Sequence, residues 1–341
     1  MTSRERVRAA LRFEGPDRIP RDLWTLPWAE EHYPSELAEI RRRYPSDIVA
    51  APSPMLRSSR VKGDPYAIGS YTDEWGCVFV NIQRGAIGEV RDPIVPDLAA
   101  WRRVVSPPYE TLTVDSGRAR EEVNRFCGGT GLFVLAEACP RPWERYQFLR
   151  GTTDALMDVA LMEGDAAGLL DAIHHYYLAE LAFWTETEVD AIRFMDDWGS
   201  QNQLLISPAS WRRVFKPLYR EYAERAHEAG KFIFMHSDGN IEQIYPDLVE
   251  IGIDAVNSQL FCMDRERLAA AVKGKITFWG EIDRQQILPS ENAEEGRRGV
   301  RELARHLYDP SGGIIAQCEF GLAANPAVVA AVFEEWDRFR G

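Results

Sequence analysis

The chain has few cysteines and no long apolar segment, and both shortages limit the class of protein it can be. Its 341 residues include only five cysteines, which are far apart in the sequence: Cys77, Cys127, Cys139, Cys262 and Cys318. An odd number without close pairing argues against a disulfide framework and against a zinc ribbon. No apolar run approaches a membrane span, and the N-terminus lacks the features of a secretory signal. We therefore expect a cytoplasmic protein with free thiols and no membrane partner.

The charge and the missing nucleotide motifs exclude further classes. The formal net charge is -13, which repels nucleic acid and anionic lipid, so we expect no nucleic-acid partner. The sequence contains no Walker loop, no dinucleotide fingerprint and no motif of a catalytic serine triad. The chemistry must therefore come from another set of polar residues.

Short apolar runs alternate with amphipathic helices along most of the chain, which is typical of parallel βα units. The runs predict strands over 47–51, 132–136, 191–195, 231–235, 254–257, 276–279 and 314–317. The number of units and the missing phosphate loop favour a single (β/α)8 TIM barrel over 1–341 rather than a doubly wound sheet. Residues 60–115 are rich in Gly, Pro and alternating apolar residues, and they predict a hairpin insertion that covers one barrel mouth.

Polar residues follow the predicted strands, and in such barrels the chemistry lies where the strands end. The candidates at these positions are Asp47, Glu137, Asp196, Asp197, Trp198, His236, Asp238, Asn257, Gln259, Glu281, Asp283, Cys318 and Glu319. A single Asp or Asn there often does no more than cap the next helix. Capping does not require Trp198, His236 or Cys318, so we expect the strand ends to form a site.

His236 and Asp238 are two residues apart, so an extended segment points both side chains to the same face. With Cys318 they offer nitrogen, oxygen and sulfur ligands, a set that suits zinc with one position open for a thiol substrate. The alternative is that His236 is a hydrogen-bonded pocket residue and Cys318 a small buried hydrophobe. Asp196 and Asp197 also leave two alternatives open. They could have a raised pKa and act as an acid, or one could cap a helix while the other pairs with an arginine.

Several motifs are spread over nearly the whole chain: Asp17-Arg18-Ile19-Pro20 followed by Trp24, Asp196-Asp197-Trp198-Gly199, the stretch from His227 to Asp254, and Gly280-Glu281-Ile282-Asp283. They resemble the uroporphyrinogen decarboxylase superfamily, which also contains zinc-dependent corrinoid and coenzyme M methyltransferases. The resemblance implies a TIM barrel and a homodimer. It leaves the activity open, because the superfamily has divergent branches.

The decarboxylase branch implies that Asp47 holds pyrrole nitrogens and that Tyr146 contacts the substrate. The arginine-rich motif that grips substrate carboxylates in that branch is replaced here by residues around Leu23-Trp24-Thr25-Leu26, and its late histidine falls at Phe320. Losing bidentate arginine clamps weakens the binding of a polycarboxylate. Cofactor-free decarboxylation of uroporphyrinogen or a related carboxylate is therefore the second interpretation.

The methyltransferase branch implies zinc held by a His-x-Cys pair and a later cysteine, with a thiol acceptor methylated from a corrinoid. His236 matches, Asp238 replaces the first cysteine, and Cys318 lies two residues before the expected position. A carboxylate is a harder zinc ligand and leaves a bound thiolate less nucleophilic. The expected catalytic residues are Asp47, Asp197, His236 and Glu281, and the expected substrate-binding residues are Trp24, Tyr146, Asp196, Trp198, Gln201, Asn257 and Gln259.

Together with the residues at the strand ends, the resemblance therefore implies an enzyme with a small-molecule substrate, zinc as cofactor and a corrinoid protein as partner. A third interpretation is a tetrapyrrole- or corrinoid-binding protein without catalysis. In that case Trp24, Trp198 and Trp279 would be its stacking surfaces, although aromatic residues more often belong to a core.

Overall fold

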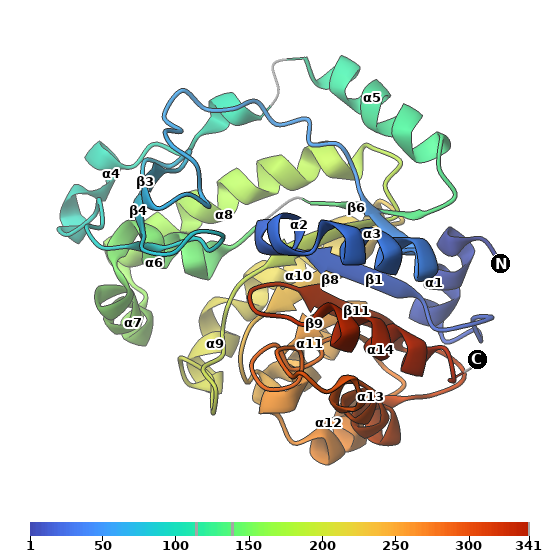
Figure 1. Cartoon of the computed structure of the whole chain (residues 1–341). Helices are drawn as coiled ribbons and strands as arrows, with labels where there is room; N and C mark the ends of the chain where they lie inside the picture. Colours follow the sequence, from blue (N-terminus) through green and yellow to red (C-terminus); the bar gives the residue numbers. More distant parts are fainter. Residues whose placement is uncertain (113–114, 138–139, 340–341) are drawn as a thin grey trace.

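The computed structural model describes residues 1–112, 115–137 and 140–339, and its centre is a barrel of eight parallel strands (Figure 1). The strand order is β1-β11-β10-β9-β8-β7-β6-β2. The strands are β1 (Arg21–Thr25), β2 (Ile48–Ala50), β6 (Phe133–Ala136), β7 (Ala191–Met195), β8 (Phe232–Ser237), β9 (Ala255–Ser258), β10 (Thr277–Trp279) and β11 (Ile314–Phe320). The expected (β/α)8 barrel is confirmed.

The strand β1 is the barrel strand that the apolar runs did not predict. The side chain of Asp22 in this strand lies in the barrel interior. Its carboxylate accepts hydrogen bonds from the indole nitrogens of Trp24 and Trp279, both at 2.9 Å. A buried carboxylate is tolerated when donors of this kind surround it. The segment therefore looks polar in the sequence although it forms part of the barrel wall.

Helices surround the barrel, and two long helical stretches are interrupted. The helices are α1 (Ser3–Arg12), α2 (Pro27–His32), α3 (Pro34–Arg43), α4 (Trp101–Val104), α5 (Ser116–Gly128), α6 (Pro142–Arg150), α7 (Thr152–Leu161), α8 (Gly164–Thr185), α9 (Pro208–Val214), α10 (Lys216–Glu228), α11 (Tyr245–Glu250), α12 (Arg265–Val272), α13 (Ala293–Leu307) and α14 (Pro326–Trp336). The helical stretch over 152–185 is divided into α7 and α8 at Met162, which has a left-handed φ of 50°. The helical stretch over 208–228 is divided into α9 and α10 at Phe215, because Pro217 in the first turn of α10 cannot continue the hydrogen bonds of α9. Within the described part of the chain, no helix combines the length and apolar character that a membrane crossing requires.

Side chains on each barrel strand alternate between the interior of the barrel and the layer beneath the helices. The interior cluster consists of Val7, Leu11, Ile48, Phe133, Leu135, Ala191, Phe234, Ala255, Trp279 and Ile315. Because Val7 and Leu11 belong to α1, this helix closes the end of the barrel where the strands begin. The opposite end, where the strands finish, is the mouth.

Asp47 joins β1 to β2, the two strands at the ends of the strand order. Its N–H donates to the carbonyl of Arg21 at 2.8 Å, and its carboxylate accepts the N–H of Arg21 at 2.8 Å. The same buried carboxylate accepts hydrogen bonds from Ser3 at 2.7 Å, Arg6 at 2.7 Å and Arg18 at 2.7 and 2.9 Å. Asp47 precedes its strand, so it lies at the closed end of the barrel. The expectation that Asp47 is catalytic is therefore corrected, since its carboxylate closes the barrel.

The expected insertion is present as a small antiparallel sheet (Figure 1). Its strands are β3 (Gly69–Thr72), β4 (Val78–Asn81) and β5 (Glu89–Val90). The insertion packs on α6 and α8 through edge-to-face contacts between Trp75 and Tyr176, with ring centroids 5.1 Å apart, and between Phe79 and Phe148 at 5.0 Å. Aromatic contacts of this geometry attach the insertion firmly to the helical layer.

The role of Asp47 can be tested with Asp47→Asn, which keeps the shape of the side chain and removes its charge. We expect the free energy of unfolding to fall by about 3 kcal/mol, because buried Arg6 loses a counter-charge and the seam between β1 and β2 weakens. Urea denaturation followed by circular dichroism measures this. Glu39→Gln, which breaks an exposed ion pair with Arg42, is the control and should change little. Equal effects of the two substitutions would contradict the proposed role.

Candidate active site

The last inward-facing residues of the strands gather at the mouth of the barrel. Continuing the alternation from the interior cluster gives Asp22, Trp24, Glu137, Arg193, Asp197, His236, Asp238, Asn257, Gln259, Glu281, Gln317 and Glu319. Carboxylates outnumber arginines in this set. The mouth is therefore an acidic surface around a single histidine, which favours the binding of a cation.

Asp197, His236 and Asp238 form a group that could hold a metal ion. One ligand atom from each lies within 4.8 Å of the others. The Nε2 atom of His236 is 3.6 Å from a carboxylate oxygen of Asp197 and 3.6 Å from one of Asp238. The N–H of Asp238 also donates to Asp197 at 2.8 Å, which fixes the two acids relative to each other. An imidazole nitrogen with two carboxylate oxygens fits zinc and leaves a fourth position open.

Asn257 decides which nitrogen of His236 faces this group. The amide nitrogen of Asn257 donates to the carbonyl of Trp279 at 2.6 Å, so its oxygen is the atom that lies 2.6 Å from His236 Nδ1. The Nδ1 atom must therefore carry the proton in the neutral ring, and Nε2 presents its lone pair to Asp197 and Asp238. An outer partner of this kind orients a metal-binding histidine and raises its basicity.

Arg284 connects three carboxylates beside the group. It lies 2.5 Å from Asp238, 2.8 Å from Glu281 and 3.4 Å from Glu319. Burial raises the pKa of Glu281 to about 8, although Arg284 opposes the rise and Asp238 adds to it. Glu281 is therefore mostly protonated at neutral pH and can act as an acid.

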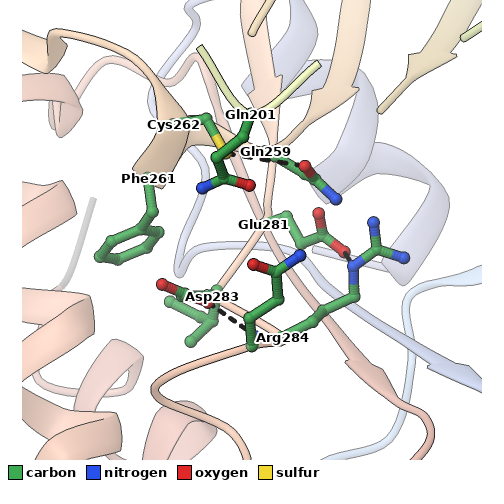
Figure 2. Close-up of a pocket in the computed structure, with 9 residues that line it drawn as sticks. Gln201, Gln259, Phe261, Cys262, Glu281, Asp283 and Arg284 are labelled. Atoms are coloured by element: carbon green, nitrogen blue, oxygen red, sulfur yellow. Dashed lines mark hydrogen bonds and ion pairs between the residues drawn. The ribbon is translucent and has the colours of Figure 1, made fainter. Parts of the chain in front are cut away.

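A small cavity of about 20 Å³, with room for about one water molecule, opens next to Glu281 and Arg284, which point toward each other in Figure 2. Its lining residues are Gln201, Gln259, Phe261, Cys262, Glu281, Ile282, Asp283, Arg284 and Gln285. The carboxamide oxygen of Gln259 accepts the N–H of Gly239 at 3.1 Å and lies 3.7 Å from the thiol of Cys262. The expected pocket residues Gln201 and Gln259 thus lie at the cavity wall.

Trp24 lies against the imidazole of His236, with ring centroids 5.6 Å apart. It contacts Trp279 edge to face at 5.1 Å, and the guanidinium carbon of Arg193 lies 5.4 Å from the centre of its ring. Burial raises the pKa of Asp22, below these rings, to about 6. Trp24 therefore gives the mouth an apolar wall beside the histidine.

Cys318 does not join the group around His236. It lies in the outer core with Ala316 and Phe320, beneath the helices, and it is fully buried. The next residue, Glu319, points to the mouth and contacts Arg284. The expectation that Cys318 is a zinc ligand is therefore corrected. Residues two apart in a strand lie on the same face of that strand, but the face that carries Cys318 points to the outer core and not to the mouth. The four described cysteines are free thiols, and Cys139 lies outside the described residues.

Two residues expected to bind substrate are also part of the core. Trp198 is fully buried, stacks on Trp143 with ring centroids 5.1 Å apart and donates from its indole nitrogen to Tyr219 at 2.7 Å. Tyr146 is buried and donates to Asp158 at 3.0 Å. The expectation that Trp198 and Tyr146 contact a substrate is corrected, because both side chains have their partners inside the protein.

Asp196 caps a helix, while its neighbour Asp197 faces the mouth. The carboxylate of Asp196 accepts hydrogen bonds from the N–H groups of Trp143 and Glu144, both at 2.8 Å, and from the hydroxyl of Tyr219 at 2.6 Å. It therefore fixes the start of α6, and its expected role in substrate binding is corrected. Glu144 was not expected at the site. Burial raises its pKa to about 7, and the charge of Asp197 raises it further, while Arg141 lowers it.

Arg284 is the other important residue that the sequence did not predict. It follows Asp283, whose carboxylate accepts the N–H groups of Gln285 at 2.7 Å and Gln286 at 2.9 Å, so the capping alternative for Asp283 is the one observed. The turn directs Arg284 back toward Glu281, three residues earlier. Neither residue lies in a helix, so their three-residue spacing gave no signal for the pair in the sequence.

The family model described as uroporphyrinogen decarboxylase (URO-D) matches residues 120–339. The chain belongs to the URO-D family. The fold of this URO-D protein is similar to that of a methyltransferase from Methanosarcina mazei, with a TM-score of 0.70, 16% identity and 99% of each chain covered. A chitinase from Chromobacterium violaceum ATCC 12472 gives a TM-score of 0.43 at 11% identity, over 94% of this chain and 100% of the chitinase. A comparison with curated proteins finds no match.

The raised pKa of Glu281 makes the stability of the metal-free URO-D protein depend on pH. Between pH 4.5, the usual pKa of a glutamate, and about pH 8, Glu281 keeps its proton in the folded protein but has lost it in the unfolded chain. Wild type should therefore lose stability relative to Glu281→Gln as pH rises, by about 1.4 kcal/mol for each pH unit at most. Urea unfolding in chelator at about pH 5.5 and about pH 7.5 measures the difference. A gap between the two proteins that stays constant with pH would contradict the assignment.

Proposed function

We propose that this URO-D protein is a zinc-dependent methyltransferase that activates a thiol acceptor for methyl transfer from a corrinoid. The observation that carries the proposal is the group Asp197, His236 and Asp238 at the barrel mouth, with Nε2 of His236 directed at both acids. The chemistry of these donors fits zinc, and a fourth position would remain for the thiol. Membership of the family supports the proposal, since the family includes methyltransferases by the resemblance described above.

In this proposal each residue of the mouth has a separate task. When bound, zinc supplies a Lewis acid that holds a thiol as its thiolate at neutral pH. Asp197 and Asp238 would neutralise the charge of the ion, and Asn257 keeps the His236 ring in the orientation that presents Nε2. The wall formed by Trp24 would limit the access of water to this side of the site.

The expected methyl donor is a corrinoid carried by a partner protein, and the expected acceptor is a small thiol that approaches the barrel mouth beside Glu281. The cavity reaches Gln201, Gln259 and Arg284, which would orient the polar part of the acceptor. A homodimer remains the expected assembly. The solved structure from Methanosarcina mazei is described as a methyltransferase, which is consistent with the transfer but names neither donor nor acceptor.

The other two interpretations have less support. Decarboxylation of a polycarboxylate requires free cations that bind the carboxylates of the substrate. Arg193 already pairs with Glu137 at 3.2 Å, and Arg284 already contacts Asp238 and Glu281. Asp47 is at the closed end of the barrel. A protein that only binds a tetrapyrrole needs exposed stacking surfaces, whereas Trp198 and Trp279 are fully buried.

Elemental analysis of purified protein reconstituted with zinc tests the proposal. Wild type should hold one zinc ion, and His236→Ala and Asp197→Asn should lose most of it because each removes a ligand. Cys318→Ala is the matched control and should keep the metal, since its thiol faces the outer core.

The same proteins are then assayed for demethylation of methylcobalamin by 2-mercaptoethanol, followed by the absorbance of the cobalamin. Activity should require zinc and disappear in His236→Ala. Full activity in zinc-free protein would contradict the proposal, and so would loss of zinc in folded Cys318→Ala but not in His236→Ala. Metal-independent release of carbon dioxide from uroporphyrinogen would favour decarboxylation instead.

A further inference from the structure

The guanidinium of Arg284 already holds one of the proposed metal ligands. Its Nη2 atom lies 2.5 Å from Oδ1 of Asp238. The same Oδ1 atom is the one that lies 3.6 Å from Nε2 of His236. A single carboxylate oxygen is therefore shared between an internal cation and the candidate metal site.

A metal ion and this guanidinium cannot both keep their closest contact with that oxygen without mutual repulsion. Zinc bound to a histidine nitrogen and a carboxylate oxygen lies about 2 Å from each, which would bring it near Nη2 of Arg284. The side chain of Arg284 is 25% exposed and that of His236 is 8% exposed, so water screens the two positive charges only weakly.

We propose that Arg284 is a built-in counter-ion of the metal site, which competes with the metal for Asp238 and thereby sets the metal affinity. The inference rests on the metal site of the proposed function. In the metal-free protein the guanidinium neutralises Asp238, and this limits the repulsion among the acids of the mouth. When a metal binds, Arg284 gives up Asp238.

The other contacts of Arg284 allow this exchange without unfolding. Its Nε atom is 2.8 Å from Glu281 and its Nη1 atom is 3.4 Å from Glu319, so contacts with these two residues remain when Asp238 is released. The contact with Glu281 lies on the side of the cavity in Figure 2.

Arg193 provides a matched comparison at the same mouth. It pairs with Glu137 at 3.2 Å and lies over the ring of Trp24. It shares the acidic surroundings of Arg284, but it pairs with Glu137, an acid outside the metal group. A general effect of positive charge would appear in both arginines, whereas competition for a ligand would appear in Arg284 alone.

The test is zinc affinity, measured on the full chain by competition with a chelating dye. Arg284→Gln should bind zinc about 10- to 100-fold more tightly than wild type, the size of effect that outer groups have on metal sites. Arg284→Lys keeps the charge and should stay closer to wild type, and Arg193→Gln should change little. Equal or weaker binding by Arg284→Gln would overturn the inference.

The outcomes separate this inference from the proposed function. If wild type binds zinc through His236 and Arg284→Gln shows no gain, the metal site stands and the competition is wrong. If neither protein binds zinc, both are wrong. Binding by Arg284→Gln alone, abolished by adding His236→Ala, would support the competition and contradict the proposed zinc-dependent function of the wild-type protein. A crystal structure of wild type with zinc gives a result independent of any variant: Nη2 should have left Asp238, and a retained contact would overturn the inference.

Discussion

The alternation of side chains along a barrel strand is the constraint on which the site depends. Consecutive residues point to opposite sides, so a shift of one position moves a group from the mouth to the outer core. On β11 this separates Glu319, which reaches Arg284, from Cys318, which is buried beneath the helices. After β7 it separates Asp197, which faces His236, from Asp196, which caps α6.

The two ends of the barrel use buried charge in different ways. At the closed end, Asp47 is surrounded by Arg6, Arg18 and N–H donors, so its charge is fully compensated and closes the seam between β1 and β2. At the mouth, acids outnumber cations, and burial keeps Glu281 protonated at neutral pH. Groups held at raised free energy in this way are typical of binding and catalytic sites rather than of structural ones.

The family of this protein and its proposed chemistry rest on different observations. The match over residues 120–339 establishes the URO-D family, and the fold extends over the whole chain. A fold can host several reactions, so the chemistry has to be argued from the site itself. In this protein the group Asp197, His236 and Asp238 lies at the mouth, and Arg284 connects Asp238 to Glu281. The same guanidinium thus connects the proposed metal site to the proposed acid.

The sequence by itself determined the barrel, most of its strands and the common face of His236 and Asp238, because these follow from local periodicity. It did not reveal β1, since the inward Asp22 is satisfied by two indoles from different strands. It also could not decide the direction of Cys318 or the place of Arg284. Those depend on the register of neighbouring strands and on contacts between residues far apart in the chain, which only the tertiary structure brings together.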